Sequence, residues 1–107
     1  MRENEVLIIA AQAMTSTITG PSYDMSQSFG YKAVFVWTGF PVGTVKMQGS
    51  LDGLYWYDIA GASQATGGAS GSFIYQDATN MDVFVRPVFV YSSGSGSLNV
   101  SMAKKGF

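Results

Sequence analysis

The sequence contains neither cysteine nor histidine. The first absence excludes disulfides, thiolate zinc sites and cysteine nucleophiles, and the second removes the usual general base of hydrolytic enzymes. The many serines therefore lack the partner that activates a serine nucleophile, and no Ser-x-x-Lys arrangement replaces it. We expect a protein with no catalytic residues and no cofactor, stabilised by packing alone.

Charged residues are also scarce. They make up 12% of the 107 residues, whereas an average soluble domain carries about 25%. Six basic and seven acidic residues are scattered along the chain and give a net charge of -1, so no electrostatic footprint for nucleic acid or an anionic membrane is present. A surface poor in charge and rich in aromatics favours a protein that lies against other protein.

Long hydrophobic runs are missing as well. The apolar run near the N-terminus covers only residues 6–11 and follows the acidic Glu3 and Glu5. It is too short for a membrane span or a secretory signal. We therefore expect a buried first strand in a chain that folds in a cytoplasm.

What the sequence does contain is an all-β pattern. Short apolar runs alternate with clusters of Gly, Ser, Pro and Asp, and no stretch of a dozen residues keeps a helical period. This pattern predicts one domain over residues 1–107, an antiparallel β-sandwich, jelly-roll-like, with seven or eight short strands. A flattened barrel is the alternative. We also expect residues 1–20, the N-terminal strand region, to take part in assembly contacts.

Residues 44–59 predict a β-hairpin. Asp52-Gly53 tolerates the positive φ angles of tight turns, and two strand-like runs flank it. On the first run Val45, Met47 and Gly49 share one side of the strand, because side chains alternate with period two. The hairpin should therefore have one buried and one wetter face.

The other segments give further expectations. Residues 31–38 are apolar on both faces, which favours a central strand covered on both sides. Residues 39–43 predict a turn that joins this strand to the next as a hairpin. Residues 60–71 contain nothing to anchor a core and predict a mobile exposed loop, followed by a strand at 72–76.

Near the C-terminus the pattern is most apolar around Pro87. Because proline lacks a ladder donor, Pro87 predicts an edge strand or a bulge. Residues 92–96 then predict a turn, and residues 97–103 a last strand that pairs with the strand before it.

The carboxylates give little chemistry. Asp52 and Asp58 lie six residues apart and resemble a pair for glycoside hydrolysis, but a turn and a strand end explain them better. No DxDxDG-type spacing concentrates the aspartates in one loop, so no metal site is predicted.

Aromatic and aliphatic side chains are the better candidates for a functional surface. Tyr55, Trp56 and Tyr57 follow one another, so at least one of their rings should face outward, for a subunit contact or for stacking on sugar. We favour the subunit contact. The apolar start of the chain adds four further interface candidates: Val6, Leu7, Ile8 and Ile9.

Several short motifs, in their order and spacing, resemble small virion proteins of tailed bacteriophages, from Tyr23 onward. The motifs are Gly30-Tyr31, the run 37–44, the run 48–53 with Trp56, Val85-Arg86-Pro87, and the run 93–100 with Lys105-Gly106. The resemblance implies a structural protein of the virion, a head decoration or cement protein on the capsid surface. It implies the major capsid protein or other virion subunits as partners, and assembly as a dimer or trimer. A tail, neck or fibre role fits the same motifs.

A second, local resemblance concerns residues 50–56. The sequence SLDGLYW is similar to the strand-turn of discoidin-like carbohydrate-binding jelly rolls. It implies an alternative function as a carbohydrate-binding module for host attachment, although a shared turn does not by itself transfer a binding site.

Overall fold

The computed structural model describes residues 2–25, 28–77 and 82–106, and side chains within 9–25, 30–77 and 82–104. These residues form seven antiparallel strands in one continuous sheet, which confirms the expected all-β class. No helix among them is long and apolar enough to cross a membrane. The strands are β1 (Arg2–Ala13), β2 (Ile18–Thr19), β3 (Tyr23–Asp24), β4 (Ser28–Ser50), β5 (Tyr57–Ala65), β6 (Gly71–Asp77) and β7 (Phe84–Gly106).

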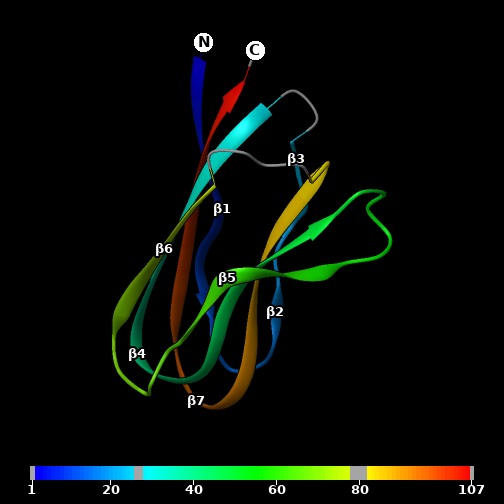
Figure 1. Cartoon of the computed structure of the whole chain (residues 1–107). Helices are drawn as coiled ribbons and strands as arrows, with labels where there is room; N and C mark the ends of the chain where they lie inside the picture. Colours follow the sequence, from blue (N-terminus) through cyan, green and yellow to red (C-terminus); the bar gives the residue numbers. More distant parts are fainter. Residues whose placement is uncertain (1, 26–27, 78–81, 107) are drawn as a thin grey trace.

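Two strands of 23 residues, β4 and β7, organise the sheet. They pair antiparallel along their whole length, from Ser28 opposite Gly106 to Ser50 opposite Phe84. A straight ribbon of this length would span roughly 75 Å, yet the protein measures 40 × 27 × 20 Å. The ribbon therefore folds over at its middle, as the lower part of Figure 1 shows.

Glycines make this fold possible. Gly39 has a φ of 93° and Gly94 a φ of 78°, values that other residues rarely adopt. A Cβ at Gly94 would lie 2.0 Å from the carbonyl oxygen of Phe40 on the facing strand. The two strands can bend together while they stay paired because the backbones approach closely here.

The fold produces two packed layers (Figure 1). The first layer consists of β1, the second half of β7, the first half of β4, and β6. The second layer consists of β2 and β3 along one edge, the first half of β7, the second half of β4, and β5. This is the arrangement of a jelly roll, so the predicted sandwich is confirmed.

Alternate residues of both long strands fill the space between the layers. Each contributing side chain points inward because the strand period is two, and residues from β1 and the β2 and β3 region close the ends. The buried residues on β4 and β7 include Tyr31, Ala33, Phe35, Trp37, Val45, Met47, Val85, Phe89, Leu98, Val100 and Met102.

The two turns predicted at residues 39–43 and 92–96 are wrong as hairpin turns. At both places the ladder between β4 and β7 continues, with Gly39 opposite Gly96 and Pro41 opposite Gly94. Glycine and proline here bend paired strands instead of reversing the chain. The segments on either side of each bend therefore lie in opposite layers and are not neighbours.

The expectation of a strand covered on both faces is also wrong. Along residues 31–38 the odd-numbered side chains are buried, whereas Lys32 and Val36 on the other face are exposed. A two-layered sandwich has only one inner face per layer, so apolar residues on the outer face stay in solvent.

Pro87 lies on an inner strand, not on an edge. It stands opposite Met47 of β4, and its carbonyl accepts a hydrogen bond from the N–H of Gly20 at 2.8 Å. Gly20 falls in the gap between β2 and β3, where no ladder donor is needed from Pro87. A Cβ at Gly20 would lie 2.6 Å from the proline ring, so glycine is required there.

The loop predicted at residues 60–71 is shorter than expected. β5 continues to Ala65, with Ala62 fully buried, and β6 begins at Gly71. The remaining loop is anchored, because the Thr66 hydroxyl donates to the carbonyl of Pro41 at 2.8 Å. Ala62 and Thr66 therefore attach this segment to the body of the protein, although its composition had indicated no residue that could do so.

Candidate interface surfaces

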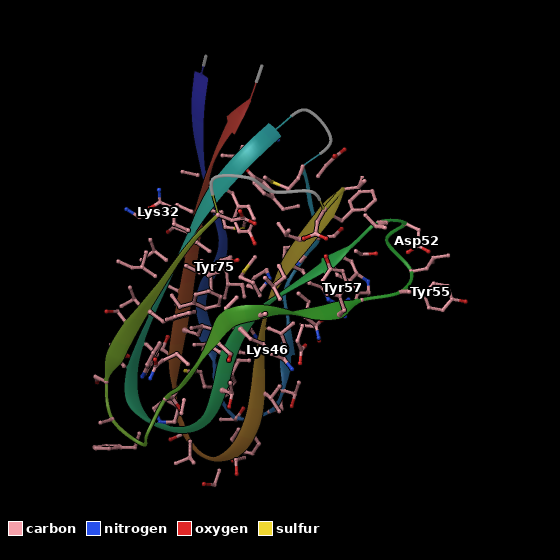
Figure 2. All side chains as sticks on the ribbon, in the orientation of Figure 1. Lys32, Lys46, Asp52, Tyr55, Tyr57 and Tyr75 are labelled. Atoms are coloured by element: carbon pink, nitrogen blue, oxygen red, sulfur yellow. The ribbon has the colours of Figure 1, made fainter. Side chains whose placement is uncertain are left out.

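The loop between β4 and β5, residues 51–56, is the most exposed apolar part of the described chain, and we call it the apolar loop. Leu51, Leu54 and Tyr55 are 68%, 78% and 80% exposed. Figure 2 shows Asp52 and Tyr55 on this loop as it projects from the body of the protein. Burial of such side chains against another molecule would stabilise a complex.

Polar groups at the start of the loop fix its shape. The Asp52 carboxylate accepts hydrogen bonds from the N–H groups of Tyr55 and Leu54, at 3.0 and 2.9 Å. These bonds hold the pKa of Asp52 below its usual value. The buried Ser50 hydroxyl accepts from the N–H of Gly53 at 2.8 Å. The predicted hairpin is therefore present, but its strands are joined by the loop 51–56 and not by a tight Asp-Gly turn alone. The bonds at Ser50 and Asp52 fix this loop so that its apolar side chains stay outward.

Trp56 and Tyr57 join the loop to the sandwich. The Arg86 guanidinium lies 4.1 Å from the centre of the Trp56 ring, in a cation–π contact. The half-exposed Tyr57 donates its hydroxyl hydrogen to the Asp82 carboxylate, which raises the pKa of Tyr57 to about 12. Of the three consecutive aromatics, Tyr55 is thus the one whose ring is most available to a partner.

A chain of polar contacts crosses the outside of the second layer. Arg86 donates to Gln48 at 2.9 Å, Gln48 donates to Asp58 at 2.9 Å, and Lys46 pairs with Asp58 at 3.0 Å. Contacts with Gln48 and Lys46 lower the pKa of Asp58. Together with Trp56, these residues form what we call the polar face.

The outside of the first layer is different. Val34 and Ile74 are cross-strand neighbours on β4 and β6, and Val36 follows on β4. Val36 is 43% and Ile74 56% exposed, while Val34 is half-buried. We call these three residues the apolar face.

The predicted interface residues at the start of the chain lie on β1, at the edge of the first layer. Val6 and Leu7 stand opposite Met102 and Ser101 of β7, and Ile8 falls within a register shift. Ile9 belongs to the core and is 6% exposed. A contact at Ile9 would therefore involve the backbone edge of β1, not the side chain.

The carboxylates do not converge on a reaction centre. Asp52 is occupied by the backbone of its own loop, and Asp58 by Lys46 and Gln48. Within the described parts of the chain, no three acidic residues gather in a way that would hold a metal ion. The geometry offers surfaces for binding other molecules.

Sequence reasoning missed most of the exposed apolar residues of the described chain, among them Leu51, Leu54 and Ile74. Leu51 and Leu54 flank the Asp-Gly pair, in a loop where polar residues are usual. Two leucines at such positions could have indicated an exposed apolar surface. Ile74 lies in the middle of a short strand, and only the layer arrangement shows that it points outward.

Comparison with known proteins finds similarity of structure only. No family model matches the chain, and no curated protein matches its sequence. The SPBc2 prophage-derived protein YomS matches with a TM-score of 0.62, 11% identity and 96% coverage of both chains. A protein of Bacillus endospore appendages, which are disulfide-linked pili, matches with a TM-score of 0.58, 12% identity and coverage of 99% and 88%.

A viral coat protein has the same architecture. The Tobacco streak virus coat protein, solved as a dimer, matches with a TM-score of 0.51 and 11% identity, over 95% of this chain and 85% of that one. Because all three identities are so low, the likeness establishes a shared fold and nothing further.

Proposed function

We propose that this chain is a non-enzymatic structural protein of a bacteriophage virion, a decoration or cement protein that binds the shell of major capsid protein. The observation that carries the proposal is the apolar loop, whose Leu54 and Tyr55 side chains are held in solvent by a preformed turn. The motif resemblance and the jelly roll shared with a prophage-derived protein and a coat protein support it.

The mechanism requires no chemistry. A decoration protein buries apolar and hydrogen-bonding surface across joints between shell subunits, so that parting the subunits also breaks its own contacts. The preformed loop reduces the conformational entropy lost on binding. Repetition around a shell turns modest single-site affinities into strong collective binding. A place in the tail, neck or fibre would use the same surfaces.

The first test uses particles stripped of this protein. Adding back the wild-type chain should restore resistance to heat and to low ionic strength. The Leu54→Ser variant should bind the particle at least tenfold more weakly, since burial of a leucine side chain is worth roughly 1.5–3 kcal/mol. Gln64→Ala, a change at an exposed position of β5, is the matched control and should bind as the wild type does.

A carbohydrate-binding function is the second candidate, and the 80% exposed ring of Tyr55 favours it. Stacking on sugar would depend on Tyr55 and would be indifferent to Leu54. A glycan signal that Tyr55→Ala abolishes and Leu54→Ser preserves would support the carbohydrate function over the shell contact. Stripped particles that are as stable as complete ones would contradict the cement function.

A further inference from the structure

The first layer ends at β6, which pairs with β4 alone among the described strands. We propose that a second copy of this chain pairs with β6 through its own β6. The two strands run antiparallel about a two-fold axis at Ile74, so the first layers of two copies form one continuous sheet. This proposal rests on the proposed assembly function and names one of its contacts.

Three of the four sheet edges carry features that discourage such pairing. β1 has two register shifts and a positive φ of 48° at Ala11. β2 and β3 are two residues long each and are separated by Gly20-Pro21. β5 pairs with one register shift and has a φ of 79° at Gly61. Bulges, prolines and very short strands are the usual ways in which proteins protect an edge.

β6 has none of these features. Its seven residues pair with β4 in an unbroken register, from Tyr31 opposite Asp77 to Trp37 opposite Gly71. Its sequence GSFIYQD contains no proline, lysine or arginine, and no residue of it has a positive φ. A regular, nearly uncharged edge of this kind offers its backbone donors and acceptors to another strand.

The sequence of β6 is also complementary to itself, as a two-fold contact requires. With Ile74 on the axis, Ile74 meets the partner's Ile74, and Phe73 meets the partner's Tyr75. Ser72 then stands opposite the partner's Gln76, and Gly71 opposite the partner's Asp77. Apolar residues face apolar residues, polar face polar, and no like charges oppose each other.

Packing within one copy already orients these side chains for the contact. Phe73 and Tyr75 are half-buried on the inner side, with ring centres 5.9 Å from those of Phe35 and Tyr31 respectively. Ile74 is 56% exposed on the outer side. Pairing would extend both aromatic rows across the axis and cover Ile74, joining the apolar faces of two copies.

Sedimentation equilibrium of the isolated full chain is the first test. The wild type should dimerise, and Ile74→Lys should raise the dissociation constant at least tenfold, because two ammonium groups would meet on the axis. Ser101→Lys places the same charge on the same outer side of the layer, on β7 and two strands further in, and should change the constant less than about twofold. A monomer at every concentration, or equal effects of both variants, would overturn the proposal.

Single cysteines test the register itself, independently of how Ile74→Lys folds. The chain has no cysteine of its own. Cross-strand Cβ atoms are about 4.5–5.5 Å apart, so Ile74→Cys should form an intermolecular disulfide rapidly under mild oxidation. The thiols of Ser72→Cys would stand about 13 Å apart and should remain reduced. Equal cross-linking of the two variants would refute this register.

These results are separable from those for the proposed function. A chain that stays monomeric in solution yet binds stripped particles refutes the β6 contact and leaves the decoration function in place. A dimer that cross-links through Ile74→Cys but binds no particle would support the β6 contact and refute the decoration function.

Discussion

On the second layer, the outward side chains of neighbouring strands bond to one another. Arg86, Gln48, Asp58 and Lys46 form a continuous series of contacts, and Trp56 lies under the guanidinium at its end. On the outside of the first layer, Val34, Val36 and Ile74 lie together among polar residues and are half-buried or exposed, and their aliphatic side chains can form no such series of polar contacts.

The difference shows how one sandwich can carry two kinds of surface. Polar side chains on an outer face can satisfy each other within the chain, and such a face needs no partner. Aliphatic side chains on an outer face gain little from each other, and they release free energy only when another surface covers them. We therefore expect the polar face to contribute mainly to stability, and the proposed association to depend on the apolar face and the apolar loop.

The largest effect should come from Arg86→Ala on the polar face. The change removes the cation–π contact with Trp56 and the donor to Gln48 together. We expect the free energy of unfolding to fall by about 2 kcal/mol, measured by urea denaturation. Lys32→Ala, at an exposed position of the first layer, should change it by less than about 0.5 kcal/mol. Equal losses of unfolding free energy in the two variants would show that the polar face does not contribute more to stability than the outside of the first layer.

A smaller effect on stability is expected when the apolar face is made polar. The double variant Val36→Ser, Ile74→Ser should lower the unfolding free energy by about 0.5–1 kcal/mol, through reduced strand propensity. Self-association should fall far more, by at least tenfold in the dissociation constant, as judged by sedimentation. A large stability loss with unchanged association would show that these residues serve the fold alone.

The smallest effect concerns Asp58. Its pKa is lowered in the folded state by Gln48 and Lys46, so its contribution is present above the unfolded value of 3.8 and is lost as the pH falls below it. At pH 7, Asp58→Asn should cost about 0.3–0.5 kcal/mol, since the Lys46 pair is exposed. The stabilities of wild type and variant should converge as the pH falls below 3.8 and passes through the lower pKa of the folded state. A difference that grows in acid would contradict this assignment.

Much of the fold was predictable from local pattern. The alternation of Val45 and Met47 predicted the buried face of the strand before the hairpin, and Asp52-Gly53 predicted the place where the chain reverses between β4 and β5. Both depend on period two and on turn chemistry, which neighbouring residues determine.

The bends were not predictable in the same way. Glycine and proline at residues 39–43 are compatible with a hairpin turn or with a bend in a paired strand. Only the ladder to β7, formed by residues far along the chain such as Gly96 opposite Gly39 and Tyr91 opposite Gly43, decides between them. The same holds for Pro87, whose missing donor is harmless because β2 has ended at Thr19.

The candidate surfaces were predictable in part. The aromatic run 55–57 pointed to the correct loop, and the structure adds Leu51 and Leu54 beside Tyr55. The polar face was not expected, because its partners come from three strands whose order the sequence does not reveal.

Thiol labelling on intact particles tests the central claim most directly, since the chain supplies no competing cysteine. A Leu54→Cys variant and a Gln64→Cys variant would be labelled free in solution and bound to stripped particles. We predict that binding slows labelling at position 54 at least tenfold and changes the rate at position 64 less than twofold. Failure of the chain to bind particles, or equal labelling of Leu54→Cys in both states, would contradict the account.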